Sequence, residues 1–289
     1  MRVTGVDACK RGWVAVTLEA SGPASSSADG TASPPAPDPG PAGARAYAVG
    51  GPALAAIRMH ESLAGALDDL QGAPRIVGID MPLGLLESGW RDADRLARGL
   101  LGPRQSSVFA IPPRAVWAEA SYQAANQRCR ELTGQGFSIQ AWGLRAKLLE
   151  ANEYLQTCRH PMYEVHPELA FGAMAGAPLL HSKHTAPGRA LRREVLAAAG
   201  IILPAAASGA ASASAPRTRA PRSSAPRPPG RRSSAPRPPA RRAAVFPETD
   251  TLDAAAVAWS TWRIATGKAV VLPDHPQLDS RGRQITIRY

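Results

Sequence analysis

The sequence predicts an α/β fold in which helices flank a mixed β-sheet. Residues 76–79 form an apolar run rich in β-branched side chains that ends at Asp80, as expected of a strand buried on both faces. Residues 2–8 and 12–20 carry alternating side chains around a Lys10-Arg11-Gly12 turn, which predicts an antiparallel hairpin. Apolar residues at helical spacing occur between and after these segments, so helices are expected to cover the sheet.

The remaining elements follow from periodicity and from turn residues. A short strand over residues 45–49 is expected to return to the sheet, and the leucine spacing after it predicts a helix over residues 53–70. Residues 85–157 are expected to form a mainly helical insertion. Further along, the sequence predicts a short strand and a Pro-started helix within 161–168, a helix over 189–199, a helix over 250–266 capped by Thr249, and a closing hairpin around 279–282.

We expect a single folded domain built from residues 1–203 and 244–289. Residues 21–44 are rich in Ser, Pro, Gly and Ala and have no hydrophobic period, which predicts a flexible loop insertion. Residues 204–243 consist largely of Ala, Ser, Pro and Arg and carry a tandem repeat. Because this segment has no apolar side chain larger than Ala, it cannot offset the entropy cost of ordering, and we expect it to be disordered.

The net charge of +11 comes mostly from one segment. Nine arginines and no acid lie between residues 201 and 247, which leaves a charge of only +2 for the rest of the chain. This excludes a strongly basic folded surface. Cys9, Cys129 and Cys158 lack metal-type spacing, which predicts free thiols and a cytoplasmic protein. No apolar run reaches the roughly 20 residues that a membrane span requires, so no membrane partner is expected.

Carboxylates occur where the predicted elements should converge. Asp7 and Asp80 each follow a strand, and open α/β sheets bind ligands at the carboxyl ends of their strands. Asp250 and Asp253 are three positions apart and share one helix face. Carboxylates gathered in this way repel one another unless a cation lies between them, and oxygen ligands suit Mg²⁺ or Mn²⁺. The alternative is that these acids cap turns and complement a helix dipole.

A second group lies near Pro167. In a strand, Glu164 and His166 would share a face, so both could point into the same cleft. Glu164 is a candidate further metal ligand, and His166 is a candidate proton carrier near neutral pH. The alternative is that His166 only forms a local hydrogen bond and that Glu168 only occupies the first turn of a helix.

Basic residues near this group offer a third set of candidates. Lys183, Arg189 and Arg192 could hold a substrate phosphate, although exposed basic side chains are usually only solvated. Arg91 and Asp94 are spaced i, i+3, and we expect them to form a structural ion pair rather than to act in catalysis.

Five motifs along the chain resemble those of one family. They are Gly5-Val6-Asp7, the stretch from Gly78 to Gly84, Tyr163-Glu164-Val165-His166-Pro167-Glu168, the stretch from Ser182 to Gly188, and Asp250-Thr251-Leu252-Asp253-Ala254-Ala255. The chain resembles domain of unknown function family 429, which is described as predicted nucleases with an RNase H-like fold. The last motif is also similar to the closing acidic motif of RuvC-like resolvases. Thr251 is a departure, because the family often has a second consecutive aspartate there.

The resemblance covers most of the chain outside residues 21–44 and 204–243. It implies an RNase H-like mixed sheet flanked by helices, and metal-binding roles for four residues, which are Asp7, Asp80, Asp250 and Asp253.

Together these observations predict an enzyme, a metal-dependent nuclease that hydrolyses phosphodiester bonds in DNA or RNA. Two Mg²⁺ or Mn²⁺ ions would be held by the four aspartates, with help from Glu164 or His166. Two other classes stay open. A nucleic-acid-binding protein without catalysis would rely on the arginine-rich segment. An actin-like ATP-binding phosphotransferase would need Gly-rich phosphate turns in two related halves, of which one is evident.

Overall fold

The structure is a computed structural model that describes residues 1–20, 51–68, 75–204 and 246–289. The predicted loop at 21–44 and the predicted strand at 45–49 lie outside the described residues, as does the predicted disordered segment at 204–243 apart from Pro204. The elements described below all belong to one unit, Met1–Leu203 with Phe246–Tyr289.

The centre of this unit is a five-stranded mixed sheet with the order β3-β2-β1-β4-β5. Its strands are β1 (Arg2–Cys9), β2 (Gly12–Ala20), β3 (Pro52–His60), β4 (Ile76–Asp80) and β5 (Met162–Glu164). β1 and β2 form the predicted antiparallel hairpin, and β3 pairs with β2 in antiparallel fashion. β4 runs parallel to β1, and β5 runs parallel to β4. A second, two-stranded sheet pairs β6 (Val271–Leu272) with β7 (Ile287–Arg288).

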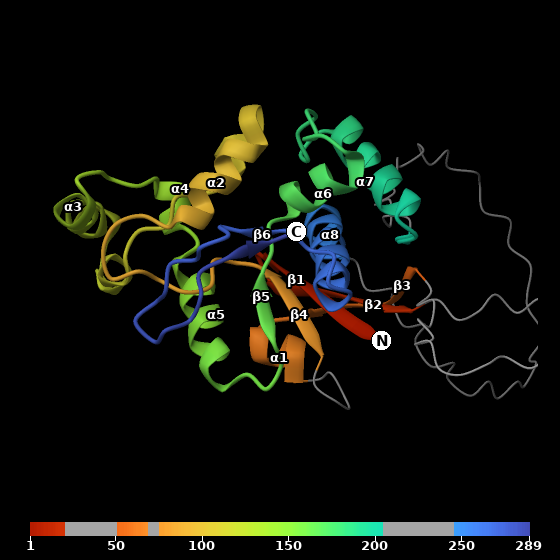
Figure 1. Cartoon of the computed structure of the whole chain (residues 1–289), viewed down its shortest axis with the longest axis horizontal. Helices are drawn as coiled ribbons and strands as arrows, with labels where there is room; N and C mark the ends of the chain where they lie inside the picture. Colours follow the sequence, from red (N-terminus) through yellow and green to blue (C-terminus); the bar gives the residue numbers. More distant parts are fainter. Residues whose placement is uncertain (21–50, 69–74, 205–245) are drawn as a thin grey trace, which may run out of the picture. The chain divides into compact units, whose positions relative to one another are not determined.

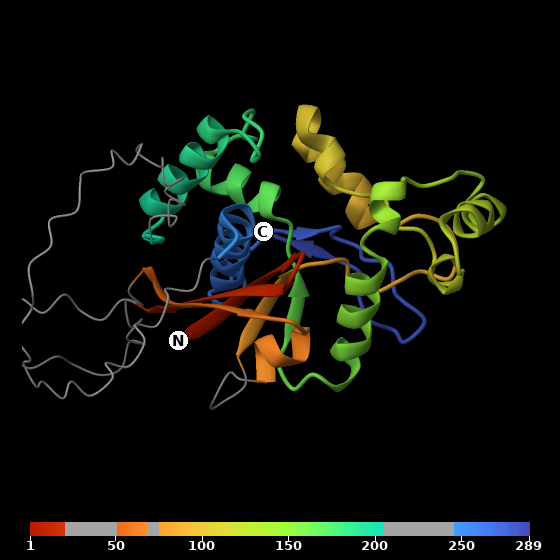
Figure 2. The same cartoon turned by 180° about the vertical axis from the view of Figure 1, so that it is seen from behind.

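Helices cover both faces of the five-stranded sheet (Figure 1). Helices α1 (Leu63–Asp68) and α5 (Arg145–Thr157) pack on the face that carries Val6 and Ile79. Helix α8 (Glu248–Ala265) packs on the opposite face, and α6 (Pro167–Ala175) and α7 (Ala186–Ala198) pack against α8 (Figure 2). This arrangement confirms the predicted α/β class, a mixed sheet flanked by helices.

The region between β4 and α5 is mainly helical, as predicted. It contains α2 (Asp92–Leu101), the 3-10 turns η1 (Gly102–Ser107) and η2 (Arg114–Ala118), α3 (Tyr122–Thr133) and α4 (Ile139–Trp142). Between the two 3-10 turns, the chain passes through Pro112 and Pro113 in an irregular conformation.

The predicted helix over residues 53–70 is wrong, because β3 takes up its first part, through His60, and the helix that follows, α1, covers only Leu63–Asp68. The helix-like spacing of Leu54 and Ile57 has a different cause. Leu18 pairs with Leu54 and Thr17 pairs with Ala56, so the residue between them is the extra residue of a β-bulge. The bulge returns Leu54 and Ile57 to one face of the strand, where both pack against the core under α8.

Two helix starts also differ from prediction. The predicted cap Thr249 is wrong, because Thr249 lies inside α8 and Pro247 is the N-cap residue. The Thr251 hydroxyl donates instead to the carbonyl oxygen of Pro247 (2.7 Å). Helix α7 begins three residues earlier than predicted, because the Thr185 side chain caps it by accepting a hydrogen bond from the Gly188 N–H (3.2 Å).

Two neighbouring glycines allow α8 to lie directly on the sheet. Gly5 of β1 and Gly78 of β4 are paired in register. A Cβ atom at Gly5 would collide with the backbone of Ala258, and one at Gly78 would collide with the Thr261 hydroxyl. The glycine in each Gly-x-Asp motif therefore has a packing role, which is to bring α8 and its acidic first turns close to the strand ends. In the described ranges, no helix is long and apolar enough to cross a membrane.

Candidate functional site

The site is built on the paired aspartates of the two central parallel strands. Asp7 and Asp80 are Cα partners, Asp80 at the end of β4 and Asp7 two residues before the end of β1. Alternate residues of a strand share a face, so both aspartates lie on the face of Gly5 and Gly78. That face is covered by α8. The prediction that the two strands bring these carboxylates together is therefore confirmed in its geometry.

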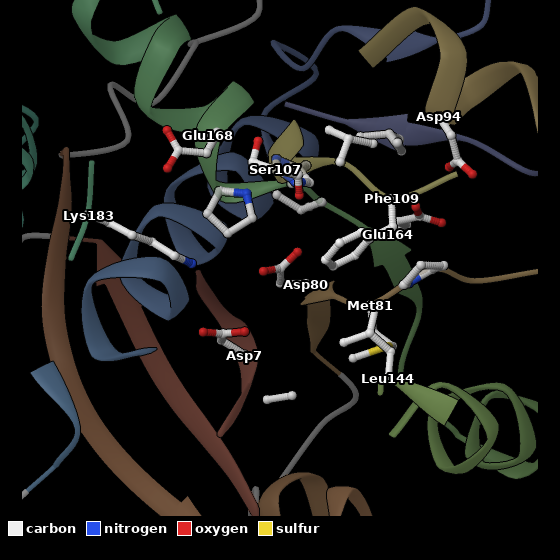
Figure 3. Close-up of a pocket in the computed structure, with 17 residues that line it drawn as sticks. Asp7, Asp80, Met81, Asp94, Ser107, Phe109, Leu144, Glu164, Glu168 and Lys183 are labelled. Carbon is white, nitrogen blue, oxygen red and sulfur yellow. The ribbon is translucent and has the colours of Figure 1, made fainter. Parts of the chain in front are cut away.

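Helix α8 supplies a third carboxylate, from Asp253, which is 1% exposed. Its Oδ2 atom lies 2.5 Å from the Nζ atom of Lys183, a residue of the loop before α7. Its Oδ1 atom is buried and has no hydrogen-bond partner among the described residues. The Lys183 amine also points toward the carboxylates of Asp7 and Asp80 (Figure 3). Within the described residues, the Lys183 ammonium is thus the positive charge that compensates the three acids Asp7, Asp80 and Asp253.

The proton equilibria of the cluster reflect this shortage of positive charge. Burial raises the pKa of Asp7 well above its ordinary value, and the negative charges of Asp80 and Asp253 raise it further. Burial also raises the pKa of Asp80 to about 7, although Lys183 and a hydrogen bond with Asp7 lower it. Burial lowers the pKa of Lys183, but the adjacent Asp253 outweighs this and the net shift is upward. Lys183 therefore stays charged, whereas Asp7 and Asp80 hold protons more readily than ordinary aspartates.

A second set of acids, Glu164 and Asp94, lies near the first but belongs to other elements. Glu164 accepts hydrogen bonds at Oε2 from the Arg91 guanidinium (2.5 Å) and from the Leu83 N–H (2.7 Å). Asp94 accepts a hydrogen bond from the Ile111 N–H (2.9 Å), and its Oδ1 lies 3.5 Å from Arg91 Nε. This confirms the predicted Arg91–Asp94 pair. Burial still raises the pKa of Glu164 to about 7, although Arg91 lowers it.

His166 follows β5 instead of lying within it, and it is the N-cap residue of α6. Its Nε2 atom lies 3.1 Å from the carbonyl oxygen of Ser107. Because a carbonyl can only accept, Nε2 carries the proton in the neutral ring, and Nδ1, which has no partner within the described residues, is left as the basic atom. Burial lowers the pKa of His166, so the ring is neutral near pH 7.

The other predicted residues lie farther from the cluster centre. Asp250, in the first turn of α8, does not line the cavity, and its pKa is raised by partial burial and by Asp253. Arg189 pairs with Glu248 at 3.0 Å. Arg192 is fully buried and binds Glu168 through two hydrogen bonds (2.6 and 2.9 Å).

Of the three predicted phosphate-binding residues, Lys183 is therefore the one that lines the cavity. The Arg192–Glu168 pair serves a different purpose. Arg192 also donates to the carbonyl oxygens of His181 and Gly188 (both 3.0 Å), so it ties the loop that carries Lys183 to α6.

A cavity of about 220 Å³ lies between the two sets of acids, although Asp253, like Asp250, is not among its lining residues. Its polar lining includes Asp7, Asp80, Glu164, His166 and Lys183 (Figure 3). Asp94, Ser107 and Glu168 also line it. Its apolar lining includes Met81, Pro82, Val108, Phe109, Leu144 and Ile287. Met81 and Pro82 lie in the motif from Gly78 to Gly84, but Val108, Phe109, Leu144 and Ile287 belong to none of the five motifs, so the sequence did not predict this apolar side.

Whether the site suits a divalent cation depends on its donors and its charge. No group of three or more His, Cys, Asp or Glu side chains in the described part of the chain is arranged to hold a metal ion as it stands. The donor chemistry nevertheless fits, because carboxylate oxygens are the ligands that Mg²⁺ and Mn²⁺ prefer. When ionised, Asp7, Asp80 and Asp253 exceed the charge of Lys183 by two. The unpartnered Asp253 Oδ1 adds a buried oxygen that a cation could satisfy.

Comparison with known proteins gives one match. A family model described as "Protein of unknown function (DUF429)" matches residues 5–278, a range that contains all the carboxylates discussed above. No curated protein matches the chain, and no solved structure matches it.

Proposed function

The chain belongs to the DUF429 family, and from this premise we propose that it is a metal-dependent nuclease that hydrolyses phosphodiester bonds in nucleic acid. The observation that carries the proposal is the in-register pair Asp7 and Asp80, which faces Asp253, with Lys183 as the one cation among them in the part of the chain that the structure describes. Such a set is costly to bury without further positive charge. A Mg²⁺ or Mn²⁺ ion would supply that charge.

Asp7, Asp80 and Asp253 would hold the ion, and Asp250 would contribute at the outer edge of the site if a second ion binds. When bound, such an ion supplies Lewis-acid activation of the phosphodiester and of the attacking water. The protein's own groups do the rest. Lys183, whose ammonium stays charged, would bind a non-bridging phosphate oxygen. His166, neutral and with Nδ1 unprotonated, would accept a proton from water.

Glu164 has a different role in this proposal from the one that the sequence suggested. Its Oε2 atom is already bound by Arg91 and by the Leu83 N–H. We therefore assign it to shaping the cavity and not to the first set of metal ligands. We place the reaction in the cytoplasm, where the three free cysteines, Cys9, Cys129 and Cys158, would remain reduced.

The test is cleavage of labelled DNA and RNA in the presence of Mn²⁺ and in the presence of a chelator. The wild-type protein should cleave the labelled nucleic acid in the presence of Mn²⁺ and should not cleave it in the presence of the chelator. Asp80→Asn should lose more than about 100-fold in rate, because even residues that only orient metal ligands typically account for 10- to 100-fold. His166→Ala should lose about 100-fold or more while keeping its Mn²⁺ affinity. Binding of both nucleic acids without cleavage under any of these conditions would refute the proposal.

A further inference from the structure

We infer that the cavity takes its substrate as an extended single strand, with one base stacked on the ring of Phe109. The inference rests on the proposed nuclease function, because it assumes that a phosphodiester must reach the aspartates. It adds the substrate class and a residue that determines specificity.

The first argument is the burial of Asp7 in a small cavity. Asp7 is only 6% exposed, and it lines a cavity of about 220 Å³. This volume is below the roughly 300–1,000 Å³ of ordinary small-molecule sites. A base-paired duplex is stiff and keeps its bases stacked, so an enzyme that acts in a deep pocket must pull the nucleotide out of the stack at a cost of a few kcal/mol. A single strand can place one nucleotide in the cavity without that cost.

The second argument is the chemical difference between the two sides of the cavity. The Lys183 amine reaches in from one side, and the Phe109 ring lies beside Asp80 on the other (Figure 3). Met81 and Leu144 extend the apolar side. A nucleotide has the same division, since its phosphate is anionic and its base has an apolar face. Stacking of bases on aromatic side chains is the usual device of proteins that bind single strands without sequence preference.

The third argument is that Phe109 is firmly held. It precedes Ile111, whose N–H donates to Asp94 (2.9 Å), and Pro112, whose carbonyl oxygen accepts a hydrogen bond from the Trp117 indole (3.1 Å). Phe109 itself is only partly buried, so the cavity side of its ring is not used up by core packing. Asp94, through its hydrogen bond with the Ile111 N–H, thereby helps to position a stacking surface beside Asp80.

Photo-cross-linking of the full-length protein tests this inference. The probes are single-stranded DNA and RNA oligonucleotides that carry iodouracil, and the same strands annealed to their complements, with Ca²⁺ as the divalent ion. We expect the single strands to cross-link to the peptide that contains Phe109, and the duplexes to do so at least about fivefold less. Cross-linking of duplex at Phe109 to the same extent, or of single strands only outside that peptide, would overturn the inference.

Two matched variants separate stacking from simple packing. Phe109→Leu keeps an apolar side chain without the ring, and we expect it to bind single strands about fivefold or more weakly. Phe109→Tyr keeps the ring and should bind like wild type, and neither variant should change duplex binding. Equal single-strand affinity for Leu and Tyr variants would contradict the inference. The wild-type cross-link decides the question if Phe109→Leu does not fold.

The same samples distinguish the inference from the proposed function. Cleavage of duplex as fast as single strand with Mn²⁺ would sink the single-strand inference and leave the nuclease proposal in place. Cross-linking of single strands to Phe109 without cleavage under any divalent ion would sink the nuclease proposal and leave the single-strand inference in place.

Discussion

Two sets of carboxylates face one cavity, and they differ in how their charge is compensated. Glu164 receives the Arg91 guanidinium at 2.5 Å and a backbone N–H at 2.7 Å. Asp7 and Asp80 accept no hydrogen bond from a backbone N–H within the described ranges, and the nearby Lys183 is paired with Asp253. The first set is largely satisfied by the protein itself, whereas the second requires a proton or a cation from solution.

The strand register explains why such close neighbours differ. Glu164 is the Cα partner of Ile79, and Asp7 is the partner of Asp80, so Glu164 lies on the opposite face of the sheet from the two aspartates. On the face of Glu164 the chain presents Arg91 at the start of α2. On the other face it presents α8, whose own residue there, Asp253, is an acid. A difference of one residue in register thus separates a structural ion-pair set from a candidate catalytic set.

The largest expected effect on stability comes from removing Arg91, the cation that compensates Glu164 and Asp94. Arg91→Met leaves Glu164 and Asp94 buried without their partner, and this should lower the free energy of unfolding by about 3–5 kcal/mol in denaturant titrations. The control is Arg95→Met, which removes an exposed pair with Asp92 and should cost less than about 1 kcal/mol. Adding Glu164→Gln to Arg91→Met should recover part of the loss. Similar losses for Arg91→Met and Arg95→Met would contradict the distinction.

A smaller effect should follow from lifting α8 away from the aspartates. The methyl group in Gly78→Ala would meet the Thr261 hydroxyl, and overpacking of this kind costs about 1–3 kcal/mol. The Mn²⁺-induced rise in melting temperature should also shrink, because α8 carries Asp253. The control is Gly99→Ala in α2, where a Cβ atom would meet no neighbour within 4 Å and stability should not fall. If the two variants melted alike, the close approach of α8 would have no energetic role.

The part of this architecture that the sequence predicts is the part written in local patterns. The apolar run before Asp80 and the alternation around Gly12 indicate the sheet, and the two Gly-x-Asp motifs indicate that their acids meet. The prediction of a helix over residues 53–70 is wrong because of the β-bulge in β3, which gives Leu54 and Ile57 the spacing of a helix.

The contacts within the site were less accessible from the sequence. Lys183 and Asp253 are 70 residues apart, and Arg91 and Glu164 are 73 apart. Nothing local marks such residues as partners. Phe109 was missed for another reason, since a lone phenylalanine between a serine pair and a proline pair has the pattern of an ordinary loop. Its significance comes only from the elements that surround it.

A still smaller change in stability is expected in the metal-free protein when one charge is removed from the pair of Asp7 and Asp80. Asp80→Asn should raise the free energy of unfolding by on the order of 1 kcal/mol, or about 2–4 °C in melting temperature. Burial raises the folded-state pKa of Asp80 from an ordinary 3.8 to about 7. The stability that comes from protonating Asp80 is therefore complete below pH 3.8 and is lost as pH rises through about 7.

The gain from Asp80→Asn should accordingly be largest above pH 7 and should fade as the pH is lowered toward 4. Asp92→Asn is the matched control, because Asp92 is a partly exposed acid paired with Arg95 and should change stability by less than about 0.5 kcal/mol at any pH. Destabilisation by Asp80→Asn above neutral pH would mean that the charge of Asp80 is already compensated within the protein.

The most direct measurement is the Mn²⁺-induced shift in melting temperature above pH 7, compared between wild type, Asp7→Asn/Asp80→Asn and Glu164→Gln. A ligand at 100 times its Kd stabilises a protein by about 2.7 kcal/mol, so a bound ion should shift wild type by about 5–11 °C. Glu164→Gln should keep most of this shift, because Glu164 belongs to the set that the protein satisfies itself. The double variant should lose it. A full Mn²⁺ shift in Asp7→Asn/Asp80→Asn would contradict the proposal that these aspartates form a cation site.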